Sequence, residues 1–329
     1  MLRPTPACPS SWRTGVALLA ILTAILLAIT GCIAVRLGGS TIGSVHRSGT
    51  APLKVVSTQY AALAVASVTI DGQGPFPFIV DTGASSSVVD SAVATKIGLK
   101  TTRKTRQMNG VGCPANAARA KVSSWKVGDV ALPAATVSVL PMVANTKGPE
   151  IGGLLGSDVL SEFGVAALDY QGQQLRLGPA AVDLAVGLSG GSATSVPVEV
   201  VYSHGAVLAV APVFVQGHGP YPFVVDTGAA ESVLNRKTAQ KLSLPVVSTQ
   251  GEAVGVACRV RTSTDQITGW RVASVPLPGN RIVSVELPEP RKGEGIQGLL
   301  GSGTLSRFGT IAIDYSHGRL LLARRGPGG

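Results

Sequence analysis

Two aspartates at the ends of short apolar runs are the residues most suited to chemistry in this chain. Asp81 follows Phe-Ile-Val, Asp226 follows Phe-Val-Val, and Thr-Gly-Ala comes after each aspartate. A carboxylate at the end of a buried strand is costly unless it is hydrogen-bonded or paired. Two carboxylates brought close together share one proton. One of them then takes a proton from water while the other donates to a carbonyl group, which is general acid–base hydrolysis.

The segments that carry these aspartates are two copies of one sequence. Residues 63–66 recur as residues 208–211, and Gly-Leu-Leu-Gly-Ser at residues 153–157 recurs at residues 298–302. Every matching pair is offset by the same 145 residues. This period is too long for a solenoid repeat, so it predicts two homologous lobes in one chain.

The repeat and the changes in composition divide the chain into five parts. We expect a signal peptide or membrane anchor at residues 1–32, a flexible Gly/Ser-rich tether at residues 33–50, an N-terminal lobe at residues 51–178, a linker at residues 179–195 and a C-terminal lobe at residues 196–325.

Each lobe is predicted to be mostly β. Aromatic residues make up only 4% of the chain, which has 41 glycines and 21 prolines, so short strands and many turns are favoured over long helices. Alternation at residues 64–70, an Asp-Gly turn and an apolar run at residues 76–80 predict a hairpin. One short helix per copy is expected, at residues 91–97 and 236–242, and closing strands at residues 175–177 and 320–322.

The net charge of +10 raises the question of nucleic-acid binding. The basic residues are scattered, and there is no basic helix, zinc-ligand spacing or aromatic stacking platform. We therefore expect no nucleic-acid partner and interpret the charge as a solvated basic surface that suits an anionic envelope or membrane face.

The N-terminal segment predicts export and membrane attachment. Arg3 and Arg13 precede an uncharged apolar run at residues 14–35, which is about long enough to span a bilayer. The run includes Ala-Ile-Thr-Gly before Cys32, which resembles the lipobox of bacterial lipoproteins, where the cysteine is lipidated. An uncleaved signal-anchor is the alternative. Both predict an extracytoplasmic, membrane-anchored protein of a bacterial cell envelope.

Asp-Thr-Gly-Ala after an apolar strand, with Leu-Leu-Gly some seventy residues later, resembles the retropepsin-like aspartic proteases. The Leu-Leu-Gly segments here are residues 154–156 and 299–301, and the resemblance covers residues 53–177 and 198–322. It implies two retropepsin-like β-barrel lobes related by a pseudo-twofold axis, with the active site between them. Retroviral members build this site by homodimerisation, whereas pepsin-like members build it within one chain. The internal repeat favours a monomer over a homodimer of two-lobed chains.

The resemblance also implies roles for single residues. Asp81 and Asp226 would be the catalytic pair of an aspartic endopeptidase that uses neither metal nor cofactor and is inhibited by statine-type transition-state mimics. Thr82 and Thr227 would hydrogen-bond across the lobes. The glycines after them, Gly83 and Gly228, permit a tight turn and close approach of the backbone. Asp169 and Asp314, which also recur, are interpreted as structural turn formers.

Family members close over a peptide or protein substrate with a hairpin flap. The flap candidates are Gly110, Val111 and Gly112 in the first copy, and Gly255 and Val256 in the second. Next to them, Cys113 and Cys258 occupy equivalent positions, and equivalent positions near a twofold axis can come close together. The exported location permits a disulfide between them. Two separate buried thiols are the alternative, and a count of free thiols distinguishes the two.

A different class of function also fits this pattern. A catalytically inactive, peptide-binding envelope lipoprotein would keep the same fold and lose hydrolysis. Retention of both Asp-Thr-Gly segments favours the enzyme, because loss of activity usually begins with loss of a carboxylate.

Overall fold

The computed structural model describes residues 47–58, 61–109, 114–143, 150–188, 193–203, 206–287 and 295–324. The chain divides into two units, Met1–Gly43 and Ser44–Gly329, and all described residues lie in the second. The predicted anchor and tether, with Cys32, therefore lie outside the described residues. Among the described residues, no helix has both the length and the apolar character needed to cross a membrane.

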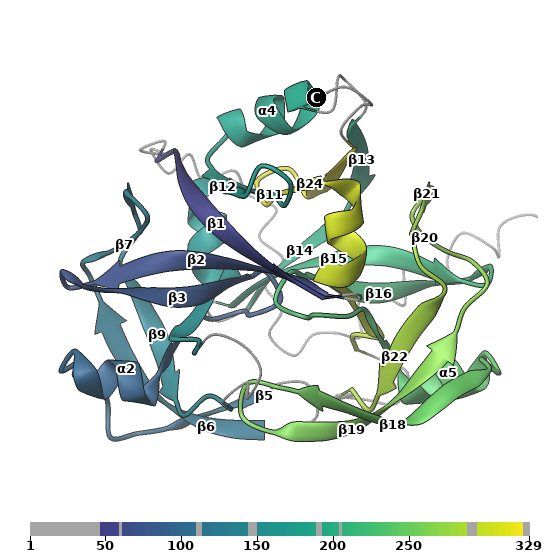
Figure 1. Cartoon of the computed structure of the whole chain (residues 1–329), viewed down its shortest axis with the longest axis horizontal. Coiled ribbons are helices and arrows are strands. Elements are labelled where there is room, and N and C mark those ends of the chain that lie inside the picture. The colour runs from purple at the N-terminus through teal and green to yellow at the C-terminus, as the bar shows by residue number, and fades with distance from the viewer. Residues whose placement is uncertain are drawn as a thin grey trace, which may run out of the picture. The chain divides into compact units, whose positions relative to one another are not determined.

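The first lobe is a sheet that runs in the order β1-β2-β3-β10-β4-β9-β6-β5, with β7 paired to β2 and β8 to β7. Figure 1 shows β2, β3, β9 and β6 of this lobe on the left of the view. Its strands are β1 (Gly49–Ser57), β2 (Ala62–Ile70), β3 (Gln73–Asp81), β4 (Val88–Asp90), β5 (Arg106–Asn109), β6 (Pro114–Val122), β7 (Trp125–Val127), β8 (Val130–Ala131), β9 (Ala135–Leu140) and β10 (Gly153–Gly156). Its helices are α2 (Ser91–Lys96), α3 (Ser157–Leu160) and the 3-10 turn η1 (Ser161–Phe163).

The second lobe repeats this order as β14-β15-β16-β23-β17-β22-β19-β18, with β20 paired to β15 and β21 to β20. Its strands are β14 (Glu199–Ser203), β15 (Ala206–Val215), β16 (His218–Asp226), β17 (Val233–Asn235), β18 (Val246–Val254), β19 (Arg259–Gln266), β20 (Trp270–Val272), β21 (Val275–Pro276), β22 (Arg281–Val285) and β23 (Gly298–Gly301). Its helices are α5 (Arg236–Lys241), α6 (Ser302–Leu305) and η2 (Ser306–Phe308).

The mostly β, two-lobed prediction is confirmed, and local sequence explains the elements. The predicted hairpin is β2–β3, whose turn residues Asp71 and Gly72 have φ of 48° and 75°, the left-handed values that a tight two-residue hairpin needs. The predicted helices are α2 and α5, which begin after Asp90 and Asn235, and each of these side chains accepts a backbone N–H of the first turn. Among the described strands the ladders run as open sheets and do not close into barrels.

A six-stranded sheet joins the two lobes. It runs in the order β13-β25-β24-β11-β12-β1, and it includes the predicted closing strands. The strands not yet given are β11 (Val165–Asp169), β12 (Gln174–Leu177), β13 (Ala193–Pro197), β24 (Thr310–Asp314) and β25 (Arg319–Ala323). At its centre β11 and β24 are antiparallel, with Ala167 opposite Ala312. These two alanines are equivalent positions of the repeat, so the pseudo-twofold axis passes between them.

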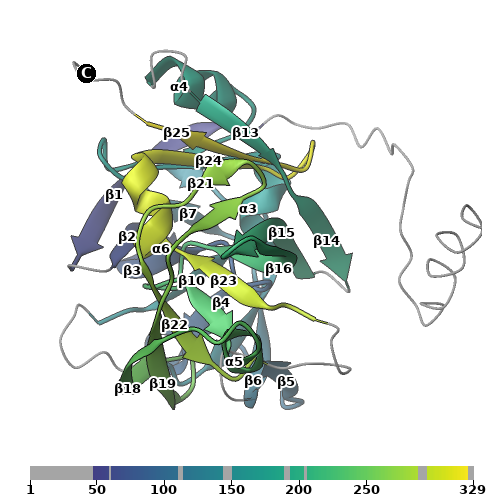
Figure 2. The same ribbon diagram turned by 90° about the vertical axis from the view of Figure 1, so that its right-hand side faces the viewer.

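The segment predicted as a linker contains a helix, α4 (Ala180–Leu188). Figures 1 and 2 show α4 above the joining sheet. Ala181 of the helix packs with Ala167, Ala312 and Leu321 of the sheet. The small residues that suggested an irregular linker instead allow a helix to lie close to the sheet, and α4 therefore covers the outer face of the junction between the lobes.

The turns that leave the two central strands are each closed by an aspartate, as predicted. Asp314, at the end of β24, accepts the backbone N–H of His317 at 3.0 Å and the guanidinium of Arg319 at 2.6 Å. Asp169, at the end of β11, accepts the backbone N–H of Gly172 at 2.8 Å. Both side chains are about 1% exposed, so these carboxylates are buried parts of the junction.

The first prediction concerns the stability provided by Asp314. Burial by itself raises the pKa of Asp314, but the hydrogen bonds from Arg319 and His317 outweigh it and hold that pKa below its usual value. A lowered folded-state pKa means that the ionised carboxylate stabilises the fold above the unfolded pKa of about 3.9, and that this contribution is lost as pH falls through the folded pKa. We expect Asp314→Asn to lower the free energy of unfolding by about 2 kcal/mol at pH 7.

Urea unfolding at pH 7 and at pH 3 measures this effect. The difference from wild type should shrink at pH 3, because the carboxyl group of the unfolded chain is mostly protonated there and the stabilising contribution of the folded carboxylate is reduced. Asp129→Asn is the control. The Asp129 side chain is fully exposed and forms an ion pair at 3.5 Å with the half-exposed Lys126. Such a surface pair contributes little to the free energy of unfolding. Equal losses in the two variants would contradict the assignment.

Candidate active site

Two strands deliver the aspartates to the same place. Asp81 ends β3 and Asp226 ends β16. Each strand pairs in parallel with the Gly-Leu-Leu-Gly strand of its own lobe, so that Gly156 lies opposite Asp81 and Gly301 opposite Asp226. The leucine segments singled out in the sequence therefore lie alongside the strands that carry the aspartates, and the large side chains at their centres, Leu155 and Leu300, are fully buried.

The threonines that follow the aspartates tie the lobes together. The N–H of Thr82 donates to the hydroxyl of Thr227 at 3.1 Å, and the N–H of Thr227 donates to the hydroxyl of Thr82 at 3.1 Å. Each hydroxyl in turn donates to a strand carbonyl of the opposite lobe, Thr82 to Val225 and Thr227 to Val80. Both threonines are completely buried. The four bonds are reciprocal, as the pseudo-twofold axis requires, and they hold the two aspartate loops together.

The glycines of the two loops face the carboxylates. A Cβ on Gly83 would lie within 2.6 Å of both carboxylate oxygens of Asp226, and a Cβ on Gly228 would meet the carboxylate of Asp81 in the same way. Each carboxylate therefore packs directly on the backbone of the opposite loop. Only glycine leaves room for this approach.

Each carboxylate is also held by its own loop. Oδ1 of Asp81 accepts the N–H of Gly83 at 3.0 Å and of Ala84 at 2.9 Å. Oδ1 of Asp226 accepts the N–H groups of Gly228 and Ala229 at 3.0 and 2.8 Å. Both side chains are fixed in orientation by backbone groups, which leaves Oδ2 of each free of backbone donors among the described residues.

The electrostatics of the pair are those of two buried like charges. Burial raises the pKa of Asp81 well above its usual value, and the charge of Asp226 raises it further. Burial also raises the pKa of Asp226, although backbone N–H groups and a hydrogen bond from Asp81 act in the opposite direction. The pair therefore holds one proton over a range of pH in which an isolated carboxyl group would be ionised, and that proton belongs to the pair.

The supports of the two loops differ. Asp158 accepts the N–H and the hydroxyl of Ser87, at 2.9 and 2.7 Å, behind the Asp81 loop. In the second lobe Gly303 stands in place of Asp158, and the hydroxyl of Ser232 bonds to that of Thr304 at 2.9 Å. The sequence showed that Asp158 lacks an acidic counterpart but did not indicate that its carboxylate holds the aspartate loop.

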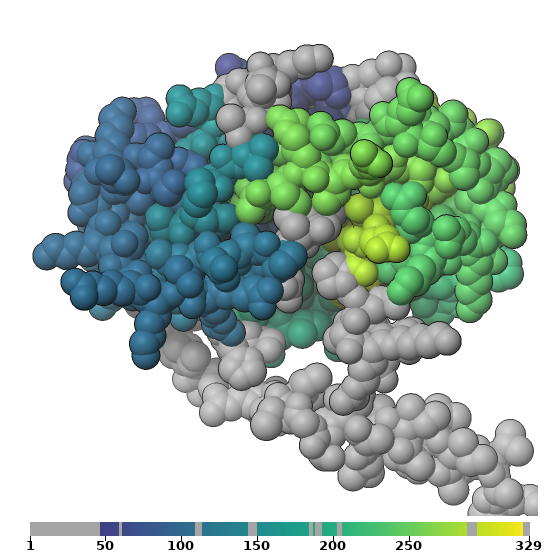
Figure 3. Space-filling model, turned by 90° about the horizontal axis from the view of Figure 1, so that it is seen from below, coloured from purple at the N-terminus to yellow at the C-terminus, as the bar shows by residue number. Residues whose placement is uncertain are grey.

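The flap candidates are only partly described. Gly110, Val111, Gly112 and Cys113 lie outside the described residues. In the second lobe, Gly255 and Val256 follow β18 and belong to the turn of the β18–β19 hairpin, where the N–H of Gly255 donates to the carbonyl of Cys258 at 2.8 Å. The two hairpins, β5–β6 and β18–β19, lie at the end of the molecule that Figure 3 views from below.

The tip of the second hairpin contacts the first lobe. The carbonyl of Val256 accepts the N–H of Val143 at 3.1 Å. Val256 and Ala257 also pack on an apolar cluster of the first lobe made of Val88, Ala117, Leu140 and Leu154. Cys258 is disulfide-bonded. Its partner lies outside the described residues, so the predicted pairing with Cys113 stays a prediction.

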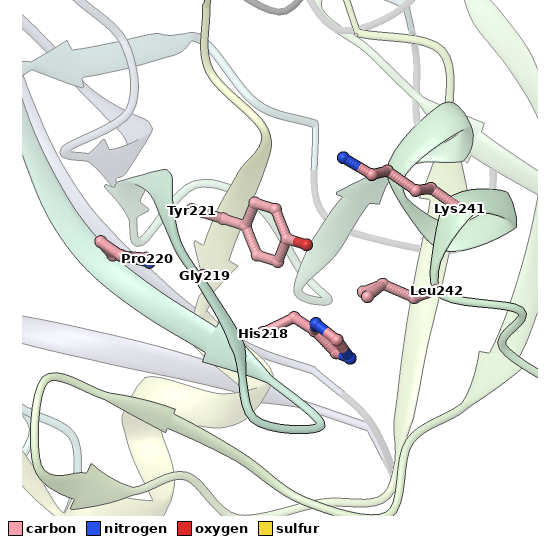
Figure 4. A pocket seen from close by; sticks show the side chains of 6 residues that line it. All are labelled: His218, Gly219, Pro220, Tyr221, Lys241 and Leu242. Carbon is pink, nitrogen blue, oxygen red and sulfur yellow. The ribbon is translucent and has the colours of Figure 1, made fainter.

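Two cavities open elsewhere on the second lobe. One, of about 380 Å³, lies between the start of β16 and the end of α5 and is lined by His218, Tyr221 and Lys241 (Figure 4). It is at the opposite end of β16 from Asp226, roughly 20 Å of strand away. A second, of about 240 Å³, lies beside Glu231 and Arg281. Neither cavity includes the aspartate pair, which is the place among the described residues where two buried carboxylates meet.

Comparison with known proteins agrees with this geometry. The aspartyl protease family model matches residues 66–159 and again residues 211–304, together more than half of the chain. Among solved structures, the crystal structure of aspartic proteinase from Irpex lacteus is similar, with a TM-score of 0.50 and 12% identity over 85% of this chain and 98% of that chain. At that identity the likeness shows the fold alone. No curated protein matches the sequence. The two matched repeats, each with its aspartate loop, establish that the chain belongs to the aspartyl protease family.

Proposed function

We propose that the protein is an aspartic endopeptidase that hydrolyses peptide bonds with a water molecule activated between Asp81 and Asp226. The observation that supports this most strongly is the packing of each carboxylate on the glycine of the opposite loop. That arrangement keeps two buried carboxylates next to each other, which an ordinary turn aspartate does not need.

The two carboxylates have different tasks in the first step. The ionised member of the pair, which we take to be Asp226, accepts a proton from the water as the water oxygen attacks the peptide carbonyl carbon. Asp81 gives the shared proton to the carbonyl oxygen. The proton on Asp226 then passes to the amide nitrogen as the C–N bond breaks, and Asp81 recovers its proton from the former carbonyl oxygen. No covalent enzyme intermediate forms, and the pair ends with one proton, as it began.

The second prediction tests this function with a mixed peptide library. We expect the full chain to cleave peptides between about pH 4 and 7, where one proton is shared, and to be inhibited by a statine-containing peptide. Mass spectrometry of the products gives the cleavage sites. Binding of the statine peptide without cleavage would favour the second candidate, an inactive peptide-binding protein of the same fold.

We also propose that the enzyme acts outside the cytoplasm, anchored through its N-terminal segment. The basic residues Arg3 and Arg13, the apolar run at residues 14–35 and Cys32 support this proposal. Mass spectrometry of the N-terminal peptide from membranes distinguishes the two anchors. A lipidated Cys32 at the N-terminus indicates a lipoprotein, and an intact N-terminus indicates a signal-anchor. An unmodified, truncated chain in the soluble fraction would contradict membrane attachment.

A further inference from the structure

Two buried tyrosines lie beneath the aspartate loops, and the reaction described above does not use them. Tyr170 follows β11 and Tyr315 follows β24, at equivalent positions of the repeat. Their side chains are only 6% and 3% exposed. Burial raises the pKa of both tyrosines, with a smaller contribution from the charge of Asp226 on Tyr170 and of Asp81 on Tyr315. Each tyrosine of one lobe is therefore close enough to sense the aspartate of the other lobe.

A chain of hydrogen bonds runs from Tyr315 to the Asp81 loop. The hydroxyl of Ser157 donates to the carbonyl oxygen of Thr82 at 2.8 Å and lies 2.9 Å from the hydroxyl of Tyr315. A serine hydroxyl has one proton, and the bond to Thr82 uses it. The hydroxyl of Tyr315 is therefore the donor to Ser157, and both bonds point toward the loop.

The chain continues to the carboxylate through one peptide group. The carbonyl of Thr82 and the N–H of Gly83 belong to the same peptide unit, and that N–H donates to Oδ1 of Asp81 at 3.0 Å. Hydrogen bonds in series polarise one another, and they do so more strongly in a buried site. A donor on the Thr82 carbonyl therefore makes the Gly83 N–H a better donor to Asp81, which favours the ionised carboxylate.

The second lobe lacks this chain among its described residues. The hydroxyl of Ser302, the equivalent of Ser157, donates to the carbonyl of Ala229 at 2.9 Å and lies 3.4 Å from that of Ala230. Neither carbonyl shares a peptide unit with an N–H that donates to Asp226. The hydroxyl of Tyr170 has no hydrogen-bond partner in the described part of the chain. The repeat thus supplies two equivalent sets of one tyrosine and one serine, and among the described residues only Tyr315 and Ser157 are connected to an aspartate loop in this way.

We propose that Tyr315 is a positioning residue of the reaction, acting through Ser157 and the Thr82–Gly83 peptide group on Asp81, and that Tyr170 has no corresponding effect on Asp226. The proposal deepens the proposed function and rests on it, since it concerns the same carboxylate pair. This series of hydrogen bonds gives the two aspartates different proton affinities, although the repeat gives them similar loops. It lowers the proton affinity of Asp81, which eases the transfer of a proton from Asp81 to the substrate.

The third prediction is a change in the titration of the Asp81–Asp226 pair when the series of hydrogen bonds from Tyr315 to Asp81 is interrupted. Among the described residues, the ionisable groups whose charge acts on Tyr315 are Asp81, Asp158 and Tyr202, and they are unchanged in the variants. Tyr315→Phe should raise the higher of the two pKa values of the pair by about 0.3 unit, because Asp81 loses part of the stabilisation of its ionised form. Ser157→Ala removes the donor to the peptide group as well, so its shift should be at least as large.

Two readouts report this shift in the full chain. One is the carboxyl ¹³C titration of labelled aspartate. The other is the alkaline limb of the pH profile of kcat/KM, which should move to higher pH by the same amount, with the acid limb nearly unmoved. In the double variant Tyr315→Phe/Ser157→Ala, the higher pKa of the pair should shift no further than in Ser157→Ala alone, because both substitutions interrupt the same series of hydrogen bonds.

Tyr170→Phe and Ser302→Ala are the matched controls, and both should leave the titration unchanged. A lower melting temperature of Tyr315→Phe without a titration shift, or equal shifts in Tyr315→Phe and Tyr170→Phe, would overturn the proposal. If Tyr315→Phe does not fold, Ser157→Ala still tests the chain. If wild type cleaves no peptide, the proposed function fails, whereas the carboxyl titration still decides whether the chain acts on Asp81.

Discussion

Asp81→Asn and Asp226→Asn should each lower kcat/KM for a cleaved peptide by at least about 10³-fold. An asparagine in place of Asp81 cannot give up a proton to the peptide carbonyl, and an asparagine in place of Asp226 cannot take a proton from water. Each substitution also removes the charge that makes its partner share a proton. A fluorogenic peptide chosen from the library products measures the effect, and binding of the statine-containing peptide shows that the substrate site is intact.

The same substitutions should raise stability near neutral pH. Both carboxylates have pKa values raised by burial, so they favour folding below the unfolded pKa of about 3.9, and this advantage is lost as pH rises through the folded values. Asparagine has no charge to bury. The melting temperature of Asp81→Asn should therefore exceed that of wild type at pH 7, with a smaller difference at pH 4.

These two results together separate a catalytic pair from a structural one. If the carboxylates only stabilised the fold, replacing one of them would lower the stability of the protein. Cleavage would then fall only in proportion to the fraction of protein that remains folded. Cleavage that survives at near wild-type rate in either variant would mean that the carboxylates do not act together.

The aspartate pair could be predicted from sequence because its signals are local and occur twice. Asp81 and Asp226 each follow an apolar strand and precede a Thr-Gly turn, and the constant offset of the repeat aligns them. A duplicated half-site implies a pseudo-twofold axis between the two copies. Equivalent residues that lie next to this axis face each other. The opposition of Ala167 and Ala312 in the joining sheet is the structural consequence.

The chain from Tyr315 to Asp81 could not be predicted in the same way. Ser157 and Tyr315 are 158 residues apart, and both recur in the repeat, as Ser302 and Tyr170, so the residue types do not show which pair is connected to an aspartate. The difference between the lobes arises from where two serine hydroxyls point. That orientation depends on packing around each loop, which a repeat pattern does not record.

The linker helix α4 shows a related limit. Its segment is rich in Ala and Gly with few large side chains, a composition that indicates irregular structure when only sequence is considered. Ala181 becomes buried because the joining sheet presents small residues, among them Ala167 and Ala312, on the face that α4 covers. Tertiary packing on a small-residue surface, which depends on both copies of the repeat, stabilises the helix.

Gly83→Ala should be almost as damaging to activity as loss of an aspartate. The new Cβ would lie within 2.6 Å of both oxygens of the Asp226 carboxylate, a distance that real Cβ atoms do not tolerate, so the loop or the carboxylate must move. A displacement of about 1 Å at a reacting group costs on the order of 10²-fold in rate. We expect kcat to fall by at least that factor and the chain to lose stability, because the reciprocal Thr82 and Thr227 bonds are next to the site of strain.

The glycine substitution tests the contact between the loops, because the matched change in the other lobe should behave in the same way. Gly228→Ala places its Cβ against the Asp81 carboxylate, so it should lower kcat to a similar extent. Gly269→Ala is the control, since a Cβ there has no atom within 4 Å and its effect on kcat should be negligible. Steady-state kinetics and thermal melting of the three variants measure both effects. Full activity in Gly83→Ala would mean that the carboxylate of Asp226 does not rest on the opposite loop during the reaction, and the close pairing on which the mechanism depends would be wrong.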